Sequence, residues 1–278
     1  MMPRFLAVAM LTVCWAIAVS ASEQSVPDTG SHRDEVFHPA LDAICGRGAR
    51  MSEGCAAIRA RRIVDAADPP WRAIGRVNFA SIEIRQHCTG TLVGDRMVLT
   101  AAHCLYNVPR KSWIPPTSLR FAAGYQRGQP VAQARVLRYL LDPAQDSASR
   151  DFRGGMTRDW ALLELEAPIG RDVGFLPLAE PEAGEPARLA GYAGLRPHVL
   201  SVAEDCGAWT PLAQRGIALT ACSAMPGDSG APLLVERDGA LLVAGVFSTI
   251  VVTEGGIPHS LAVAAPVFAP ALRAVLAN

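Results

Sequence analysis

The chain has 278 residues, of which 50% are hydrophobic and 19% charged, with 24 Gly and 21 Pro. This length gives room for one large domain or two small ones. The hydrophobic, turn-rich composition excludes a largely disordered protein and favours many short strands. The 26 basic side chains of Lys and Arg balance the 26 acidic ones of Asp and Glu, so no excess of charge favours nucleic acid or an anionic membrane surface, and we expect no nucleic-acid partner.

The N-terminus has the layout of a secretory signal peptide. Arg4 precedes an apolar run over residues 5–19, and the small residues Ser20, Ala21 and Ser22 follow it. A membrane-spanning helix needs ~20 apolar residues, so the run is too short for a stable membrane anchor. A core helix of a cytosolic domain is the alternative interpretation. We expect residues 1–21 to be removed as a signal and the remaining chain to be secreted or periplasmic.

The cysteines fit an exported protein. The chain has seven, and removal of Cys14 with the signal leaves six. These six follow one another as three close pairs, namely Cys45 with Cys55, Cys88 with Cys104, and Cys206 with Cys222. Such pairs form and persist as disulfides in an oxidising compartment, although the sequence alone allows fifteen connectivities.

A zinc site is the competing interpretation of the cysteines. His87 with Cys88, and His103 with Cys104, are conceivable ligands. The chain has no C-x-x-C knuckle and no H-E-x-x-H motif, which are usual zinc-binding patterns. We therefore expect no metal and no other cofactor.

Residues 22–62 read as a leader, because they are polar, have no sustained apolar periodicity and end in a basic cluster of Arg59, Arg61 and Arg62. From Ile63 onward, turn residues separate short apolar runs that are typical of strands. These runs are 73–84, 89–99, 118–123, 132–141, 160–165, 187–192, 233–235 and 241–251. The pattern favours an all-β barrel or sandwich, and we expect two helical segments, at 101–106 and 267–276.

Three segments carry the groups that serine acyl transfer needs, which are a base, an acid that orients it, and donors for the oxyanion. His103 closes one strand-like run, Asp159 opens another, and Ser229 lies in a Gly-rich turn over 227–232. Alone, each has an ordinary structural interpretation. Together, in this order and with Cys104 directly after His103, they resemble the trypsin and chymotrypsin-like serine proteases.

The resemblance runs from Ile63 to the end of the chain and implies two six-stranded antiparallel β-barrels with the active site in the cleft between them. His103 would be the general base and then the general acid, Asp159 its orienting partner, and Ser229 the nucleophile. The backbone N–H groups of Gly227 and Ser229 would form the oxyanion hole. The resemblance also implies a Cys88–Cys104 bridge, polypeptide substrates and a monomer.

The resemblance further indicates activation by proteolysis. Arg62, Ile63 and Val64 match the place where zymogens of this family are cut, so residues 22–62 would be a propeptide and 63–278 the protease domain. The freed ammonium of Ile63 would then pair with Asp228 and shape the oxyanion hole, which requires an activating protease as a partner. One departure is that Asp65 and Ala66 follow where the family usually has two glycines.

The specificity pocket is less readable. The residue six positions before Ser229 is Ser223, which by the resemblance lies at the base of the primary pocket and carries no charge, so cleavage after Arg or Lys is not supported. Ser248 resembles the strand that pairs with the substrate backbone. His259 could face the pocket, as a histidine does in bacterial glutamyl endopeptidases, or could be an ordinary loop residue. Cys222 also resembles a bacterial branch.

The sequence predicts an exported serine endopeptidase made as a zymogen, and three other functions compete with this prediction. An α/β-hydrolase using Ser229, Asp238 and His259 fails because its elbow needs glycine where Ala231 stands, and because too few residues follow Ser229 for its sheet. The second rival, a catalytically silent relative that acts as a binding module, stays open as the alternative. An exported zinc protein would hold stoichiometric metal.

Overall fold

The computed structural model of the protein describes residues 51–80, 85–148, 155–204, 206–212, 216–252 and 258–277. The predicted signal peptide and most of the predicted propeptide lie outside these described residues. Cys14, Cys45 and the side chain of Cys55 lie outside them too, and with them the expected Cys45–Cys55 bridge. The described residues all belong to one compact unit of the chain.

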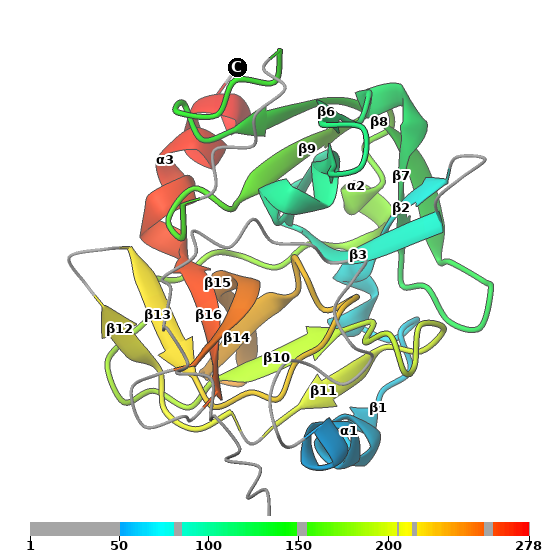
Figure 1. Cartoon of the computed structure of the whole chain (residues 1–278). Helices are drawn as coiled ribbons and strands as arrows, with labels where there is room; N and C mark the ends of the chain where they lie inside the picture. The colour runs from blue at the N-terminus through cyan, green and yellow to red at the C-terminus, as the bar shows by residue number, and fades with distance from the viewer. Residues whose placement is uncertain are drawn as a thin grey trace, which may run out of the picture. The chain divides into compact units, whose positions relative to one another are not determined.

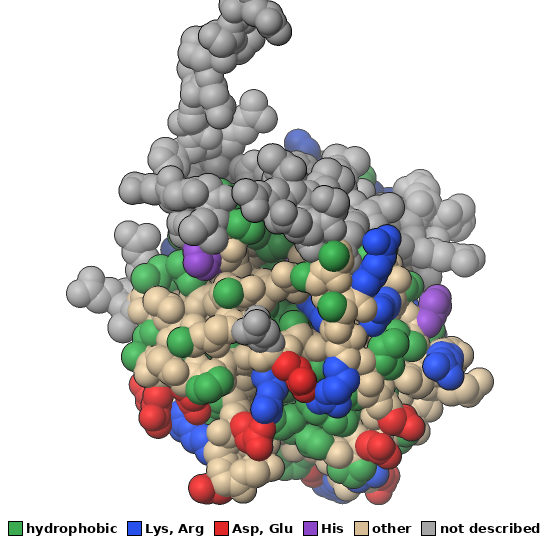
Figure 2. Space-filling model, turned by 90° about the horizontal axis from the view of Figure 1, so that it is seen from below, with side chains coloured by type: hydrophobic (Ala, Val, Ile, Leu, Met, Phe, Trp, Pro, Cys, Tyr) green, Lys and Arg blue, Asp and Glu red, His purple; other side chains and the backbone are tan. Residues whose placement is uncertain are grey.

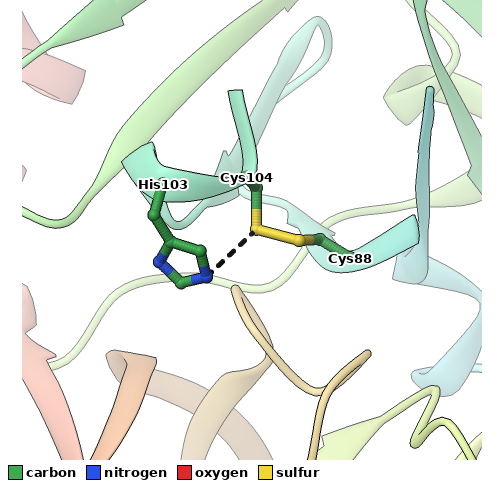
Figure 3. Close-up of side chains that lie close together, drawn as sticks. All are labelled: Cys88, His103 and Cys104. Carbon is green, nitrogen blue, oxygen red and sulfur yellow. Dashed lines mark hydrogen bonds between the residues drawn. A yellow bond between two sulfur atoms is a disulfide. The ribbon is translucent and has the colours of Figure 1, made fainter. Parts of the chain in front are cut away.

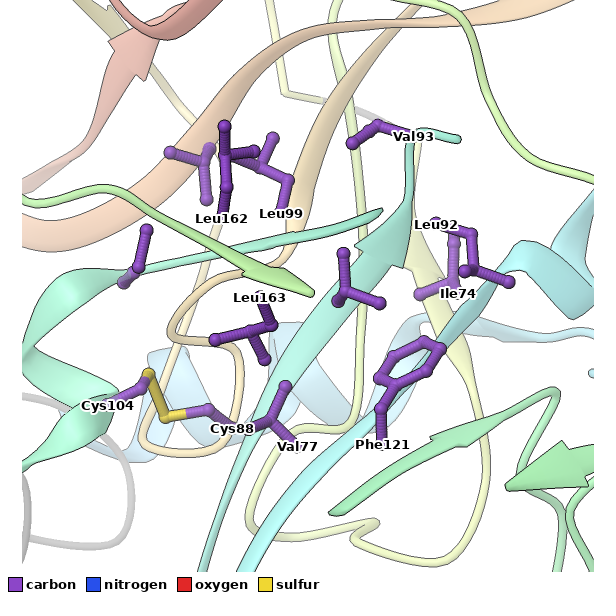
Figure 4. Packing of buried hydrophobic residues seen from close by; sticks show 14 of the residues in the cluster. Ile74, Val77, Cys88, Leu92, Val93, Leu99, Cys104, Phe121, Leu162 and Leu163 are labelled. Carbon is purple, nitrogen blue, oxygen red and sulfur yellow. A yellow bond between two sulfur atoms is a disulfide. The ribbon is translucent and has the colours of Figure 1, made fainter. Parts of the chain in front are cut away.

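Six antiparallel strands close into a barrel (Figure 1). In barrel order they are β2 (Ile74–Ala80), β3 (Arg85–Leu92), β4 (Met97–Thr100), β9 (Ala161–Leu165), β8 (Ala132–Leu141) and β7 (Leu119–Ala123). Large apolar side chains fill the interior. Ile74, Leu92, Phe121 and Leu162 are fully buried, and Figure 4 shows them within one cluster. This closed barrel confirms the first of the two predicted six-stranded barrels.

The other strands form an eight-stranded antiparallel sheet (Figure 1). In sheet order they are β1 (Arg62–Ile63), β11 (Ser201–Ala203), β10 (Arg188–Gly191), β14 (Pro232–Arg237), β15 (Ala240–Val252), β16 (Pro258–Ala264), β13 (Ile217–Thr220) and β12 (Thr210–Leu212). Its core includes Leu189, Trp209, Leu233 and Phe247. The all-β prediction is confirmed, and where a second six-stranded barrel is expected the structure has this sheet, with β1 and β12 at the ends of its strand order.

Short helices connect the strands. The elements outside the barrel and the sheet are α1 (Met51–Ala60), η1 (Trp71–Ala73), η2 (Ala102–Leu105), β5 (Tyr106–Asn107), β6 (Ser112–Trp113), η3 (Pro116–Ser118), α2 (Gly170–Val173) and α3 (Ala265–Leu276). The predicted helices at 101–106 and 267–276 correspond to η2 and α3. Phe268 of α3 packs against Trp160, with ring centroids 6.2 Å apart. Among the described helices, none has both the length and the apolar character that crossing a membrane requires.

The apolar runs predict nine of the sixteen described strands and miss seven, of which β1, β5 and β6 have only two residues each. The run at 89–99 is interrupted by the turn between Leu92 and Met97 and so makes both β3 and β4. β11, β12 and β13 have only three or four residues each, which is too short to show period-two alternation. β16 begins with Pro258 and His259, which obscure its apolar character.

Charged side chains of both signs lie interspersed on the face shown in Figure 2, without gathering by sign. This face therefore shows no large field of one sign that would attract a polyanion. Ion pairs among the described residues include Arg138 with Glu164, Arg171 with Asp95, and Arg62 with Glu204. Exposed pairs of this kind contribute little to stability.

Candidate active site

The pairing of β4 with β9 brings His103 and Asp159 together. Thr100 lies opposite Ala161 in this register, so the residues just after β4 and just before β9 meet at one end of the barrel. Asp159 Oδ2 lies 2.7 Å from Nδ1 of His103, and Oδ1 accepts a 2.9 Å hydrogen bond from its backbone N–H. Both side chains are buried. The carboxylate therefore holds both the ring and the backbone of His103.

Ser248 supplies a third donor to Asp159. Its Oγ donates a 2.5 Å hydrogen bond to Oδ2 of Asp159. Burial alone would raise the pKa of Asp159, but the charge of His103 and the hydrogen bonds from His103 and Ser248 lower it below its usual value. Since the carboxylate is then ionised and accepts from Nδ1 of His103, Nε2 is the ring nitrogen that can take up a proton.

The turn that carries Ser229 packs directly against the backbone leading to His103. The Ser229 carbonyl accepts a 2.8 Å hydrogen bond from the Thr89 N–H. Gly230 has a φ of +79°, and a Cβ there would lie 2.2 Å from Thr100 Oγ1 and 2.9 Å from the Ala101 nitrogen. Only glycine allows this approach. The close packing places Ser229 beside the turn that contains His103.

Gly227 and Ser229 present two backbone N–H groups at this turn. Neither N–H has a hydrogen-bond partner within the part of the chain that the structure describes. The Gly227 carbonyl accepts a 2.8 Å hydrogen bond from Thr89 Oγ1. Gly227 has a φ of +100°, and a Cβ there would lie 2.4 Å from the Tyr192 oxygen. These two donors can stabilise a negative charge that develops on a bound carbonyl oxygen.

His87, which the sequence alone indicates only as a conceivable zinc ligand, packs against Gly227. A Cβ on Gly227 would lie 2.9 Å from Nε2 of His87. Nε2 is also 2.9 Å from the carbonyl oxygen of Tyr192. Burial, together with nearby Arg76, lowers the pKa of His87. A neutral imidazole that donates from Nε2 satisfies this carbonyl and supports the wall behind Gly227.

Asp228 is fully buried and paired with Arg61. The two terminal nitrogens of Arg61 donate to the two carboxylate oxygens of Asp228, each at 2.9 Å. Ile63, which the sequence predicts to pair with Asp228 after a cut, lies in β1 opposite Ser201, and 47% of it is exposed. That prediction concerns the cut chain and stays a prediction. In the intact chain Arg61 pairs with Asp228, a contact that no local motif predicts.

The expected pocket residues lie in three different settings. Ser223 is half-buried, and its carbonyl oxygen accepts a 2.5 Å hydrogen bond from Arg61. Ser248 contacts Asp159, as described above. Ser260 of β16 donates to the Cys222 carbonyl at 2.6 Å. His259 is its neighbour in the strand, and neighbouring side chains of a strand point to opposite faces. His259 therefore lies on the face of β16 opposite to the one that contacts Cys222.

Two of the expected disulfides are present. Cys88 bonds to Cys104 with an S–S distance of 2.08 Å, and Cys206 bonds to Cys222 at 2.11 Å. Figure 3 shows His103 beside the first bridge, with Nε2 3.8 Å from Cys104 Sγ. The ligand atoms of Cys88, His103 and Cys104 lie within 4.8 Å of one another. Since both sulfurs are oxidised to a disulfide, this cluster has no thiolate to offer a metal.

The chain is similar to one protein family and to several characterised proteases. The trypsin family matches residues 64–272. A glutamyl endopeptidase of Bacillus licheniformis is 26% identical over 139 residues, which is 48% of this chain and 40% of that protein. Serine protease 23 of Rattus norvegicus is 26% identical over 213 residues, which is 67% of this chain and 54% of that protein. The matches thus span about half the length of these relatives.

Solved structures with the same fold include two proteases. A Glu endopeptidase in complex with MPD superposes with a TM-score of 0.64 at 19% identity, over 78% of this chain and 97% of that one. Protease Anisep from Arthrobacter nicotinovorans superposes with a TM-score of 0.54 at 18% identity, over 71% of this chain and 92% of that one. At such low identities these likenesses describe the fold.

Proposed function

The chain belongs to the trypsin family, and on that premise we propose that it is an exported serine endopeptidase whose triad is His103, Asp159 and Ser229. The observation that carries the proposal is the buried contact of 2.7 Å between Nδ1 of His103 and Asp159, with the turn of Ser229 packed against the same end of the barrel. Its substrates are polypeptides.

The geometry supports an acyl-enzyme mechanism. Ser229 Oγ attacks the carbonyl carbon of the scissile bond as Nε2 of His103 takes its proton. The resulting oxyanion accepts hydrogen bonds from the N–H groups of Gly227 and Ser229. His103 then gives its proton to the leaving amine, the C–N bond breaks, and the acyl group stays on Ser229. Water, deprotonated by His103, attacks the ester and frees the acid and Ser229.

Export and processing are part of the proposal. Residues 1–21 would be removed as a signal and 22–62 would be a propeptide of the domain at 63–278. The two disulfides support an oxidising destination, outside the cell or in the periplasm. N-terminal sequencing of the active protein tests the cut after Arg62, because residues 22–62 would be absent if that cut is needed for activity.

A fluorophosphonate probe tests the catalytic proposal, because such probes react covalently with an activated serine. The processed protein should be labelled at Ser229 and should hydrolyse peptides. The Ser229→Ala variant should keep its thermal unfolding midpoint but lose ~10⁶-fold in turnover, by analogy with triad deletions. A folded wild-type protein with neither labelling nor hydrolysis would favour the binding-module alternative, and full activity in Ser229→Ala would show that the nucleophile is another residue.

A further inference from the structure

Arg61 neutralises the buried carboxylate of Asp228 in the uncut chain. The side chains of Arg61 and Asp228 are 2% and 0% exposed. Their contact is bidentate, with two hydrogen bonds of 2.9 Å, which is the strongest geometry that guanidinium and carboxylate can adopt. Oδ2 of Asp228 also accepts a 3.0 Å hydrogen bond from the Met225 N–H. An ionised carboxylate this deeply buried needs such a cation.

Arg61 also contacts Ser223, the first residue of the segment that ends at Asp228. Its Nη2 donates to the Ser223 carbonyl at 2.5 Å as well as to Asp228. One side chain thus fixes both sides of the segment from Ser223 to Asp228. The neighbours of Asp228 in sequence are Gly227 and Ser229, whose N–H groups form the proposed oxyanion hole. Arg61 therefore holds the backbone that aims these two donors.

The residues around Arg61 are anchored on the domain. Ile58 is 1% exposed and packs with Ala193 and Met225. Arg196 donates to the Arg61 carbonyl at 3.1 Å and also to the Arg59 carbonyl. These contacts keep the guanidinium in place without a cut anywhere in the chain.

Pairing Ile63 with Asp228 would require this arrangement to be dismantled. Ile63 and Arg62 pair with Ser201 and Val202 across β1 and β11, so β1 would have to leave the sheet. Arg61 would also have to leave a buried ion pair, and the ammonium of Ile63 would have to take its place as the cation beside Asp228.

We propose that Arg61 is the positioning residue that forms the oxyanion hole in the uncut chain, so that activity does not wait for a cut after Arg62. This inference rests on the proposed serine-protease function. Arg61 supplies, from within the leader, the cation that a freed N-terminus would otherwise bring to Asp228. The propeptide proposed above would then support the active site for as long as it is attached, and the cut after Arg62 would not be the event that starts activity.

The test uses the exported chain carrying Arg62→Gln, which removes the basic residue before the predicted cut. Intact-mass measurement verifies that the leader is attached, and a fluorophosphonate probe reports on Ser229. We expect the uncut Arg62→Gln chain to be labelled and to hydrolyse peptides at rates comparable to those of the chain that is cut after Arg62. Adding Arg61→Met should slow both by about 10²-fold or more, since one oxyanion-hole donor contributes ~10²–10³ in kcat, and kcat should fall more than KM rises.

Two further variants separate positioning from simple stability. Arg61→Lys keeps the cation and should restore part of the lost kcat. Arg171→Met removes an exposed arginine whose partner is Asp95 and should change neither kcat nor the unfolding midpoint. If Arg61→Met does not fold, Arg61→Lys carries the test, because it should lower kcat while the protein stays folded, and undiminished kcat would overturn the proposal.

The outcomes distinguish this inference from the function beneath it. An uncut chain that is not labelled, beside a chain beginning at Ile63 that is, would overturn the role of Arg61 and make the cut the switch. Equal kcat in Arg61→Met and its parent would also overturn it. Absence of labelling in both cut and uncut chains would overturn the proposed function, and this inference with it.

Discussion

Ser248 donates a 2.5 Å hydrogen bond to the same oxygen of Asp159 that lies 2.7 Å from Nδ1 of His103. Asp159 lies just before β9 of the barrel, and Ser248 lies in β15 of the eight-stranded sheet. The hydrogen bond therefore ties the two sheets together at the point where the proposed triad needs a fixed carboxylate.

The Ser248→Ala variant should be less stable at neutral pH, with a loss that depends on pH. Asp159 has a lowered pKa in the folded protein, so its contribution to stability is present above the unfolded pKa of ~3.9 and is lost as pH falls through the folded value. Without the Ser248 hydrogen bond the folded pKa rises towards the unfolded one. We expect the free energy of unfolding at pH 7 to drop by about 1.5–3 kcal/mol.

Urea unfolding at pH 7 and at acid pH checks this expectation, because the difference from wild type should shrink once Asp159 is protonated. Ser260→Ala is the matched control. Ser260 is equally buried but donates to the carbonyl oxygen of Cys222, which does not titrate, so its loss should be the same at both pH values. A pH-independent loss in Ser248→Ala would contradict the argument.

The Asp159→Asn variant should fold but lose ~10⁴-fold in kcat, as the corresponding change does in a related triad. An amide would donate to Nδ1 of His103, so the ring proton would move to Nε2 and the ring could no longer accept the proton of Ser229. Steady-state hydrolysis of a peptide measures kcat. Asp65→Asn is the control, since Asp65 is exposed and caps only the Ala67 N–H. Wild-type kcat in Asp159→Asn would remove Asp159 from the triad.

The proposed triad was predictable because each member lies in a short local motif whose residues follow directly in sequence. Part of the barrel was predictable for a similar reason, since β8 alternates exposed and buried side chains from Gln133 to Leu137. The role of Arg61 was not, because it depends on a contact across 167 positions. In the sequence Arg61 is one of three clustered arginines. It is buried because Ile58 before it packs on the domain and β1 after it pairs with β11.

The Gly227→Ala variant should lose most of its activity through the oxyanion hole. A Cβ at Gly227 would lie 2.4 Å from the backbone oxygen of Tyr192, so the peptide must rotate and its N–H must turn away. We expect kcat to fall by ~10²–10³-fold with a smaller change in KM. Gly184→Ala is the control, because Gly184 also has a positive φ, of +83°, but no atom lies within 4 Å of its added Cβ.

Both glycine variants carry the strain of a left-handed residue, about 1–2 kcal/mol, and Gly227→Ala should lose more thermal stability than Gly184→Ala because its Cβ also clashes with backbone. Their activities should differ, because only Gly227 faces the reacting carbonyl. Equal kcat values in the two variants would mean that the N–H of Gly227 does not take part in catalysis.

Residue 223 should determine which charge the enzyme accepts on the substrate side chain that precedes the scissile bond. Ser223 carries no charge. Cleavage-site profiling of the wild-type enzyme on a peptide library should therefore show no enrichment of Arg or Lys at the substrate position before the scissile bond. Ser223→Asp places an anion in the pocket, and a charge-assisted hydrogen bond contributes about 1.5–3 kcal/mol, so Arg and Lys should become enriched by roughly 10-fold or more. Ser223→Asn matches the shape of this change without its charge and should leave the profile neutral. Enrichment of Arg or Lys by the wild-type enzyme would contradict the expectation for Ser223, and an unchanged profile in Ser223→Asp would show that this residue lies outside the pocket.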